Sequence, residues 1–230
     1  MSLPRRPVPE LCLALFAVVW VTLGIAPWDR GAWALENVPS VIGVGTAVAT
    51  YRRFQFSDRA YVLATIFLVL HTAGSHYTYA LMPLGAWLGE ALGAERNHYD
   101  RFVHFAYPVL MLGAVRELFF RPPASAPLRR QIVLSAALVL AFGTGWELLE
   151  WITAVIVDPG AGTAFLATQG DEWDAQKDLA MAGLGAFFGG ILEARRVSRA
   201  AHRCRKEEHT SPPARRPAEL LQRSTDGGEP

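Results

Sequence analysis

The stretch NHYDRFVHFAYPVLMLGAV (residues 97–115) places two histidines, an aspartate and an arginine directly ahead of an apolar run. Titratable side chains are costly beside hydrocarbon, so they need partners or a function there. Asp100 and His104 are four residues apart and share one face if the stretch is helical. The stretch therefore predicts a membrane-crossing helix whose first turns carry a polar wall.

Five more apolar blocks accompany this one in a chain of 230 residues that is 51% hydrophobic. A membrane-crossing helix needs about 20 mostly apolar residues, and such blocks favour a polytopic membrane protein over soluble domains. The second, third and sixth blocks reach this length only with polar residues at one end. We predict an all-α bundle of six transmembrane helices, over about Leu11–Ala26, Ala34–Tyr51, Ala60–Ala73, Arg101–Phe120, Gln131–Val157 and Asp178–Leu192.

The composition changes after the last block. Residues 1–194 are predicted to form the transmembrane domain, whereas residues 195–230 are polar, charged and proline-bearing and predict a disordered basic tail in the cytoplasm. The segment Pro83–Gly93 predicts a short amphipathic helix at the outer surface, covering the pocket. Cys12 lies in the first block and Cys204 in the tail, which does not indicate a disulfide framework.

The basic residues set the orientation. With six spans, fifteen lysines and arginines fall on one side of the membrane, with three more farther down the tail, and only Arg30, Arg96, Arg101 and Lys177 fall on the other. The positive-inside rule then places both termini in the cytoplasm. The net charge of +1 gives no indication of nucleic-acid binding.

Four predicted helices carry a histidine or a carboxylate at a similar depth. His76, His104, Glu147 and Asp178 each stand 17 residues from an arginine on the cytoplasmic side, which is roughly 26 Å along a continuous helix. This depth lies near the outer edge of the hydrocarbon. The estimate assumes that Gly74, directly after the third block, and Gly143 and Gly145 of the fifth block do not break those helices.

These residues predict an outward-facing pocket of histidines and acids. Imidazole nitrogens and carboxylate oxygens together suit a divalent transition metal such as zinc. The catalytic candidates are Asp100, His104, Glu147 and Asp178; the candidate metal ligands are His76, His104, Asp174 and Asp178; the other pocket candidates are His71, His98, Glu150 and Asp171. A bend at Gly74 would decide whether His71 or His76 faces the pocket.

Three functions fit such a pocket. The first is an enzyme in which a metal-bound or carboxylate-activated water attacks an ester or phosphoester of a lipid or envelope-linked substrate. The second is a protein that binds or transports a proton, a cation or a small ligand. The third is a structural polar network that only fixes helix packing. The sequence contains no zincin motif, nucleophile elbow or phosphate loop that would choose among them.

Several stretches together resemble a known family. In chain order they are HTAGSHYTYALMPLG (71–85), NHYDRFVHF (97–105), RELFFR (116–121), WELLEW (146–151) and TQGDEWDAQKD (168–178). They resemble the YjdF-type family of bacterial inner-membrane proteins, a domain of unknown function, from about residue 10 to 195. The resemblance implies a multi-pass protein of the bacterial inner membrane, in contact with membrane lipids.

A broader likeness is to VanZ-like proteins, whose name is associated with glycopeptide resistance. Their pattern joins an aspartate-basic-x-x-His-Phe helix start to a later glutamate helix and to an aspartate that opens a glycine-rich last helix. The matching positions here are Asp100, Arg101, His104 and Phe105, then Glu147 or Glu150, then Asp178 with Gly183 and Gly185. The sequence departs from that pattern near Ala182, where VanZ-like proteins often carry an asparagine.

Overall fold

The computed structural model describes residues 6–93, 96–121, 126–156 and 168–210, and these residues form helices and turns but no strand. The all-α class predicted from the sequence is therefore confirmed for the described chain. The helices are α1 (Pro7–Gly24), α2 (Arg30–Thr50), α3 (Asp58–His76), α4 (Pro83–Leu92), α5 (Tyr99–Phe119), α6 (Leu128–Ile156) and α8 (Asp174–Thr210).

The long helices cover the predicted apolar blocks, and local signals set where they start. The Asp29 side chain accepts a hydrogen bond from the Ala32 backbone N–H and caps α2, and Ser57 caps α3 in the same way. The glycines in question lie inside continuous helices, Gly74 in α3 and Gly143 and Gly145 in α6. The assumption behind the depth estimate therefore holds for both helices.

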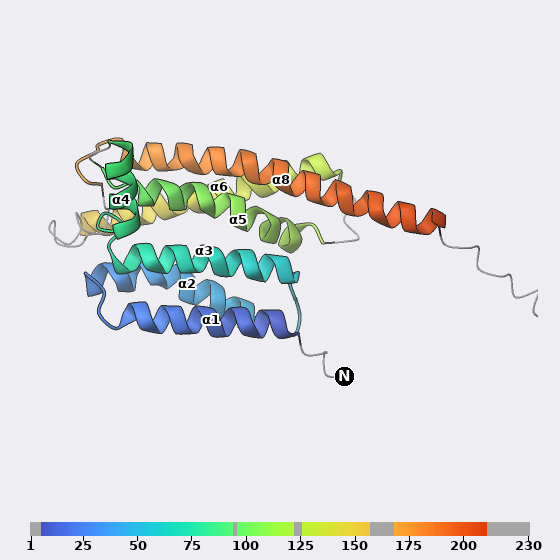
Figure 1. Cartoon of the computed structure of the whole chain (residues 1–230), viewed down its shortest axis with the longest axis horizontal. Coiled ribbons are helices and arrows are strands. Elements are labelled where there is room, and N and C mark those ends of the chain that lie inside the picture. The colour runs from blue at the N-terminus through green and yellow to red at the C-terminus, as the bar shows by residue number, and fades with distance from the viewer. Residues whose placement is uncertain (1–5, 94–95, 122–125, 157–167, 211–230) are drawn as a thin grey trace, which may run out of the picture. The chain divides into compact units, whose positions relative to one another are not determined.

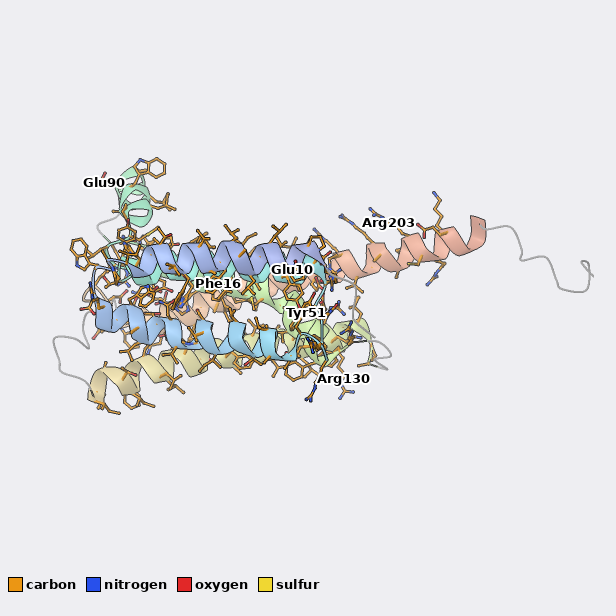
Figure 2. All side chains as sticks on the ribbon, turned by 90° about the horizontal axis from the view of Figure 1, so that it is seen from below. Glu10, Phe16, Tyr51, Glu90, Arg130 and Arg203 are labelled. Carbon is orange, nitrogen blue, oxygen red and sulfur yellow. The ribbon has the colours of Figure 1, made fainter. Side chains whose placement is uncertain are left out.

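Residues 1–194 form one compact unit, in which the long helices lie side by side (Figure 1). Helix α3 is central, because it packs against α1, α2 and α5, and α5 packs in turn against α6. The predicted short helix is present as α4, which crosses one end of the bundle and contacts α5. Figure 2 shows Glu90 of α4 at this end and Tyr51 and Arg130 at the opposite end.

Three of the described helices, α1, α5 and α6, are long and apolar enough to cross a membrane. The others carry more polar residues, and many of these point inward. Glu36, Asn37 and Ser40 of α2 are buried, while Val41 and Ile42 of the same helix are exposed. A helix with buried polar side chains and exposed apolar ones matches surroundings of hydrocarbon.

Residues 195–230 form a second unit. Its described part, residues 195–210, is helical, which differs from the disorder expected there. The sequence ARRVSRAAHRCRKEE is rich in alanine, arginine and glutamate, which have high helix propensity and allow the preceding helix to continue. The remainder of the predicted tail lies outside the described residues.

Candidate functional site at the α5, α6 and α8 helices

Helix α5 contributes the first two side chains of the site. Asp100 and His104 are one helical turn apart, so both project from the same face, and Nε2 of His104 lies 3.5 Å from Oδ1 of Asp100. Both side chains are largely shielded from solvent. The predicted pairing of these two residues on one wall is present in the fold.

Helix α6 adds Glu147 beside the histidine. Its Oε1 lies 3.2 Å from His104 Nε2, close enough for an ion pair when the histidine is protonated. The arrangement does not meet hydrogen-bond geometry, and Glu147 Oε1 is a buried oxygen without a hydrogen-bond partner in the described chain. An acceptor in this state favours a proton, a cation or a polar ligand nearby.

Helix α8 completes the cluster with Asp178. This side chain is 2% exposed, and its Oδ1 has no hydrogen-bond partner among the described residues. One ligand atom each from Asp100, His104 and Asp178 can be chosen so that all three lie within 4.8 Å of one another. We call this group, together with Glu147, the carboxylate–histidine cluster.

Close packing between α5 and α8 makes this approach possible. A Cβ atom at Gly185 would overlap the Phe105 carbonyl oxygen, and a Cβ atom at Gly189 would come within 3.0 Å of the Pro108 carbonyl oxygen. Because glycine has no Cβ, the two backbones can touch. These two glycines allow α8 to approach α5 closely, and this approach brings Asp178 to the level of His104.

Asp171 and Asp174 belong to a neighbouring group in which acids and cations pair. Arg101 donates to Asp171 Oδ2 at 2.6 Å, and Lys177 donates to the same oxygen at 2.7 Å. Arg96 donates to Asp174. The hydrogen bond from Lys177, with smaller contributions from the Trp173 backbone N–H and from Arg101, lowers the pKa of Asp171 to about 2. Asp174 is thus placed with an arginine and outside the group of three possible metal ligands.

His98 stands beside this arginine network and not in the cluster. It is the residue before the first turn of α5, and its Nδ1 lies 3.4 Å from a guanidinium nitrogen of Arg101. Burial, followed by the charges of Arg101 and Arg96, lowers the pKa of His98. A neutral imidazole is therefore favoured at this position.

The two histidines of α3 have separate environments. His71 is buried, and its Nε2 lies 2.9 Å from the backbone carbonyl oxygen of Glu36. Because a carbonyl oxygen can only accept, Nε2 of His71 is the donor. Its Nδ1 then accepts from the Tyr79 hydroxyl at 2.6 Å. Both ring nitrogens are thus occupied, which leaves no lone pair for a metal.

His76 lies elsewhere. Its Nδ1 is 2.6 Å from the Leu23 carbonyl oxygen at the end of α1, and its own carbonyl accepts from the Trp28 backbone N–H. It follows His71 by five residues, a helical rotation of about 140°, so the two rings leave α3 on different faces. The structure brings His104, Glu147 and Asp178 together but not His76.

Comparison with known proteins assigns the chain to a family. Residues 8–199 match the family described as "Predicted membrane protein (DUF2238)". This chain belongs to the DUF2238 family of predicted membrane proteins. It is similar to the "Inner membrane protein YjdF" of Escherichia coli (strain K12), with 34% identity over 178 residues that cover 77% of this chain and 85% of the relative. The resemblance to the YjdF type is thereby confirmed, and no solved structure matches.

In this DUF2238 protein the sequence reasoning missed one member of the site, Glu36 of α2. It is 4% exposed, its Oε2 has no hydrogen-bond partner among the described side chains, and the charges of Asp100 and Glu147 act on it. Glu150, one turn beyond Glu147 on α6, also lies within electrostatic range of Glu36. The available signal was a carboxylate inside an otherwise apolar block, at its third residue.

A cavity of about 860 Å³ reaches this site in the DUF2238 fold. His71 and His104 both line it, so the open question of which α3 histidine faces the pocket is answered by His71. Most of the other lining residues are apolar. Of the carboxylate–histidine cluster, His104 lines this largely apolar space, whereas Asp100, Glu147 and Asp178 are not among its lining residues.

Proposed function

We propose that this chain is a metal-dependent hydrolase of lipid or lipid-linked envelope substrates, with Asp100, His104, Glu147 and Asp178 as its catalytic residues. The observation that carries the proposal is the set of three ligand atoms, from Asp100, His104 and Asp178, that lie within 4.8 Å of one another, with His104 also lining the cavity. One nitrogen and two oxygens suit a divalent transition metal such as zinc and leave positions open for water and substrate.

The unsatisfied oxygens support this assignment over a purely structural network. Asp178 Oδ1 and Glu147 Oε1 are buried and have no hydrogen-bond partner in the described chain. A structural network stabilises helix packing by satisfying its members, and partial satisfaction costs free energy. A bound cation beside Asp178 and a water beside Glu147 would satisfy both oxygens.

The proposed reaction follows from the positions of these groups. A metal held by Asp100, His104 and Asp178 would supply Lewis-acid chemistry that lowers the pKa of a water, and Glu147 would accept the proton of that water. The resulting hydroxide attacks the carbonyl carbon or the phosphorus, and the bond to the alcohol oxygen breaks. The leaving oxygen takes the proton back from Glu147, which gives an acid and an alcohol and restores the site.

We further propose that six helices cross the membrane, with both termini in the cytoplasm and the cluster facing outward. The inward burial of the polar side chains of α2 and α3 supports spanning by helices that are less apolar overall. The excess of basic residues on one side of such a topology supports the orientation. In intact cells a membrane-impermeant maleimide should label Glu90→Cys but not Arg130→Cys, once Cys12 and Cys204 are replaced by serine. The opposite pattern would reverse the orientation.

The test of the hydrolase is elemental analysis of the purified protein. The wild type should hold one tightly bound transition metal per chain, and folded His104→Ala and Asp178→Asn proteins should lose it. Asp171→Asn is the matched control, because that carboxylate is already paired with Arg101 and Lys177. It should keep the metal.

The metal result also separates the alternative functions. A well-folded wild type without metal would overturn the proposal. If melting of the variants were then unchanged, proton or ligand binding would be favoured. If melting fell sharply in the same variants, the structural network would be favoured.

A further inference from the structure

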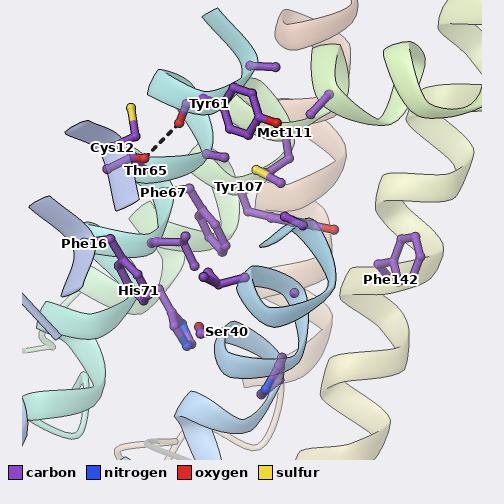
Figure 3. Close-up of a pocket in the computed structure, with 18 of the residues that line it drawn as sticks. Cys12, Phe16, Ser40, Tyr61, Thr65, Phe67, His71, Tyr107, Met111 and Phe142 are labelled. Atoms are coloured by element: carbon purple, nitrogen blue, oxygen red, sulfur yellow. Dashed lines mark hydrogen bonds between the residues drawn. The ribbon is translucent and has the colours of Figure 1, made fainter. Parts of the chain in front are cut away.

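The cavity that His104 lines lies among the helices of the bundle. Residues of α1, α2, α3, α5 and α6 line it. Figure 3 shows Cys12, Tyr61 and Thr65 toward one end and His71 and Ser40 toward the other. Its volume of about 860 Å³ falls in the range of ligand pockets, roughly 300–1,000 Å³.

The wall that α3 gives to the cavity is about half as long as the hydrocarbon core is thick. Along α3 its lining runs from Ala60 to His71, which is about 16 Å at the rise of an α-helix. Half of a hydrocarbon core about 30 Å thick is about 15 Å. An extended chain that lies in one leaflet has this length, whereas a long polyprenyl chain exceeds it.

The wall offers little to a polar ligand over this length. The Thr65 hydroxyl lies on the lining, but it donates to the Tyr61 carbonyl oxygen at 2.9 Å within its own helix (Figure 3). Phe16, Phe67 and Met111 line the same space. Titratable side chains line the cavity toward both ends, His71 at one and Tyr61 at the other, and the apolar stretch between them suits an acyl chain.

The cavity has a side through which such a chain can enter. Both α2 and α6 contribute lining residues, yet among the described helices α2 packs against α3 and not closely against α6. A Cβ atom added at Gly43 of α2 or at Gly143 of α6 would meet no neighbouring atom within 4 Å. Phe142 of α6 lines the cavity and is 60% exposed. These features leave a lateral opening toward the surrounding hydrocarbon.

We propose that this cavity binds one acyl chain of a membrane glycerolipid and holds the ester or phosphoester of that lipid at the carboxylate–histidine cluster. The inference rests on the proposed hydrolase for the reaction, and it narrows the substrate class to glycerolipids with leaflet-length chains. Burial of the chain supplies binding free energy at a distance from the reacting bond. The cluster then acts on the one polar linkage that the pocket positions.

The test uses a phosphatidylglycerol with a diazirine in the middle of one acyl chain, added to the detergent-purified full chain and activated by light. Labelled peptides should carry the lining segments of α2 and α6. Gly43→Phe should fill the cavity and reduce labelling at least tenfold. Gly45→Phe is the matched control on the same helix: it makes the same change where a Cβ also meets no atom, but Gly45 does not line the cavity. It should leave labelling unchanged.

A second variant protects the test against misfolding. Gly143→Phe blocks the cavity from α6, and it should reduce labelling in the same way when its melting equals that of Gly45→Phe. Equal labelling in the wild type and in either folded cavity variant would overturn the inference. A polyprenyl phosphate that suppresses labelling at a lower concentration than unlabelled phosphatidylglycerol would also overturn it.

The His104→Ala protein separates this inference from the hydrolase. It should keep full labelling, because His104 is at the end of the cavity, and lose both the metal and the release of product from the same lipid. If the cavity variants reduce labelling although the protein holds no metal and hydrolyses no lipid, the chain pocket is supported and the hydrolase is overturned. Hydrolysis that is unaffected by Gly43→Phe would support the hydrolase and overturn the chain pocket.

Discussion

Helix α8 buries two carboxylates, and their surroundings differ. Glu193 is 2% exposed, and its two oxygens each lie 2.9 Å from an arginine, Arg59 and Arg116. Asp178 is equally buried, about 22 Å away along the helix, but its Oδ1 has no hydrogen-bond partner in the described chain. Pairing marks Glu193 as part of the packing, whereas an unsatisfied oxygen at the same burial marks Asp178 as a residue that requires a ligand or a proton.

Cations are available close to Asp178, which makes the contrast informative. Arg101 lies 2.6 Å from Asp171 and 3.7 Å from Asp174, and Arg96 also contacts both acids. The fold therefore directs both arginines to Asp171 and Asp174. Of the acids in the carboxylate–histidine cluster, Asp100 and Glu147 lie 3.5 and 3.2 Å from His104.

The largest expected effect is on stability, when each of the two buried carboxylates of α8 is replaced by the matching amide. Glu193→Gln removes the negative charge between two arginines and leaves Arg116 buried without its ion pair. Breaking a buried pair costs about 3–5 kcal/mol. Asp178→Asn in metal-free protein removes a carboxylate that lacks such a pair and should leave stability unchanged or slightly higher.

Thermal melting of both variants in detergent, after treatment with a chelator, measures this difference. A lower melting temperature for Glu193→Gln only is the expected result. Equal and large losses for both variants would contradict the contrast and would favour a structural role for Asp178.

A smaller effect is expected from the helix packing that presents Asp178. Gly185→Val would place a methyl group against the Phe105 carbonyl oxygen, and such overpacking costs about 1–3 kcal/mol. Gly183→Val is the matched control, because a Cβ atom there meets no neighbouring atom within 4 Å. Gly185→Val should also weaken metal binding by shifting Asp178, as measured by metal content at fixed chelator concentration. Equal stability and metal content in both variants would show that close α5–α8 contact is not needed.

The sequence was sufficient for the all-α class, for the positions of the long helices and for part of the site. Blocks of apolar residues located the long helices, and the common 17-residue interval from an arginine correctly grouped His104, Glu147 and Asp178, which the structure brings together. Helical rise gives depth along the bundle, so this reasoning works for residues in continuous helices. It gave the same depth to His76, whose ring is directed to the end of α1.

The rest depended on rotation and on partners that only the folded chain supplies. Depth does not fix which face of α3 turns inward, so the choice between His71 and His76 needed the structure. The pairing of Asp174 with Arg96 joins residues far apart in sequence, and no spacing rule predicts it. Glu36 was missed because α2 was interpreted from its apolar average, in which one buried carboxylate has little weight.

The smallest expected effect is the pH dependence of the arginine network. The pKa of Asp171 is lowered to about 2, chiefly by the hydrogen bond from Lys177, from about 3.9 in an unfolded chain. A lowered pKa means that the ionised form stabilises the fold: the contribution is complete above pH ~4 and disappears as the pH falls through about 2. The difference in melting temperature between wild type and Asp171→Asn should therefore be constant from neutral pH down to about 5 and vanish near pH 2. High salt should reduce this difference, because the ion pairs of Asp171 are near water. A difference that grows on acidification would contradict this assignment, and it would mean that the protonated form of Asp171, and not its ion pairs with Lys177 and Arg101, stabilises the fold.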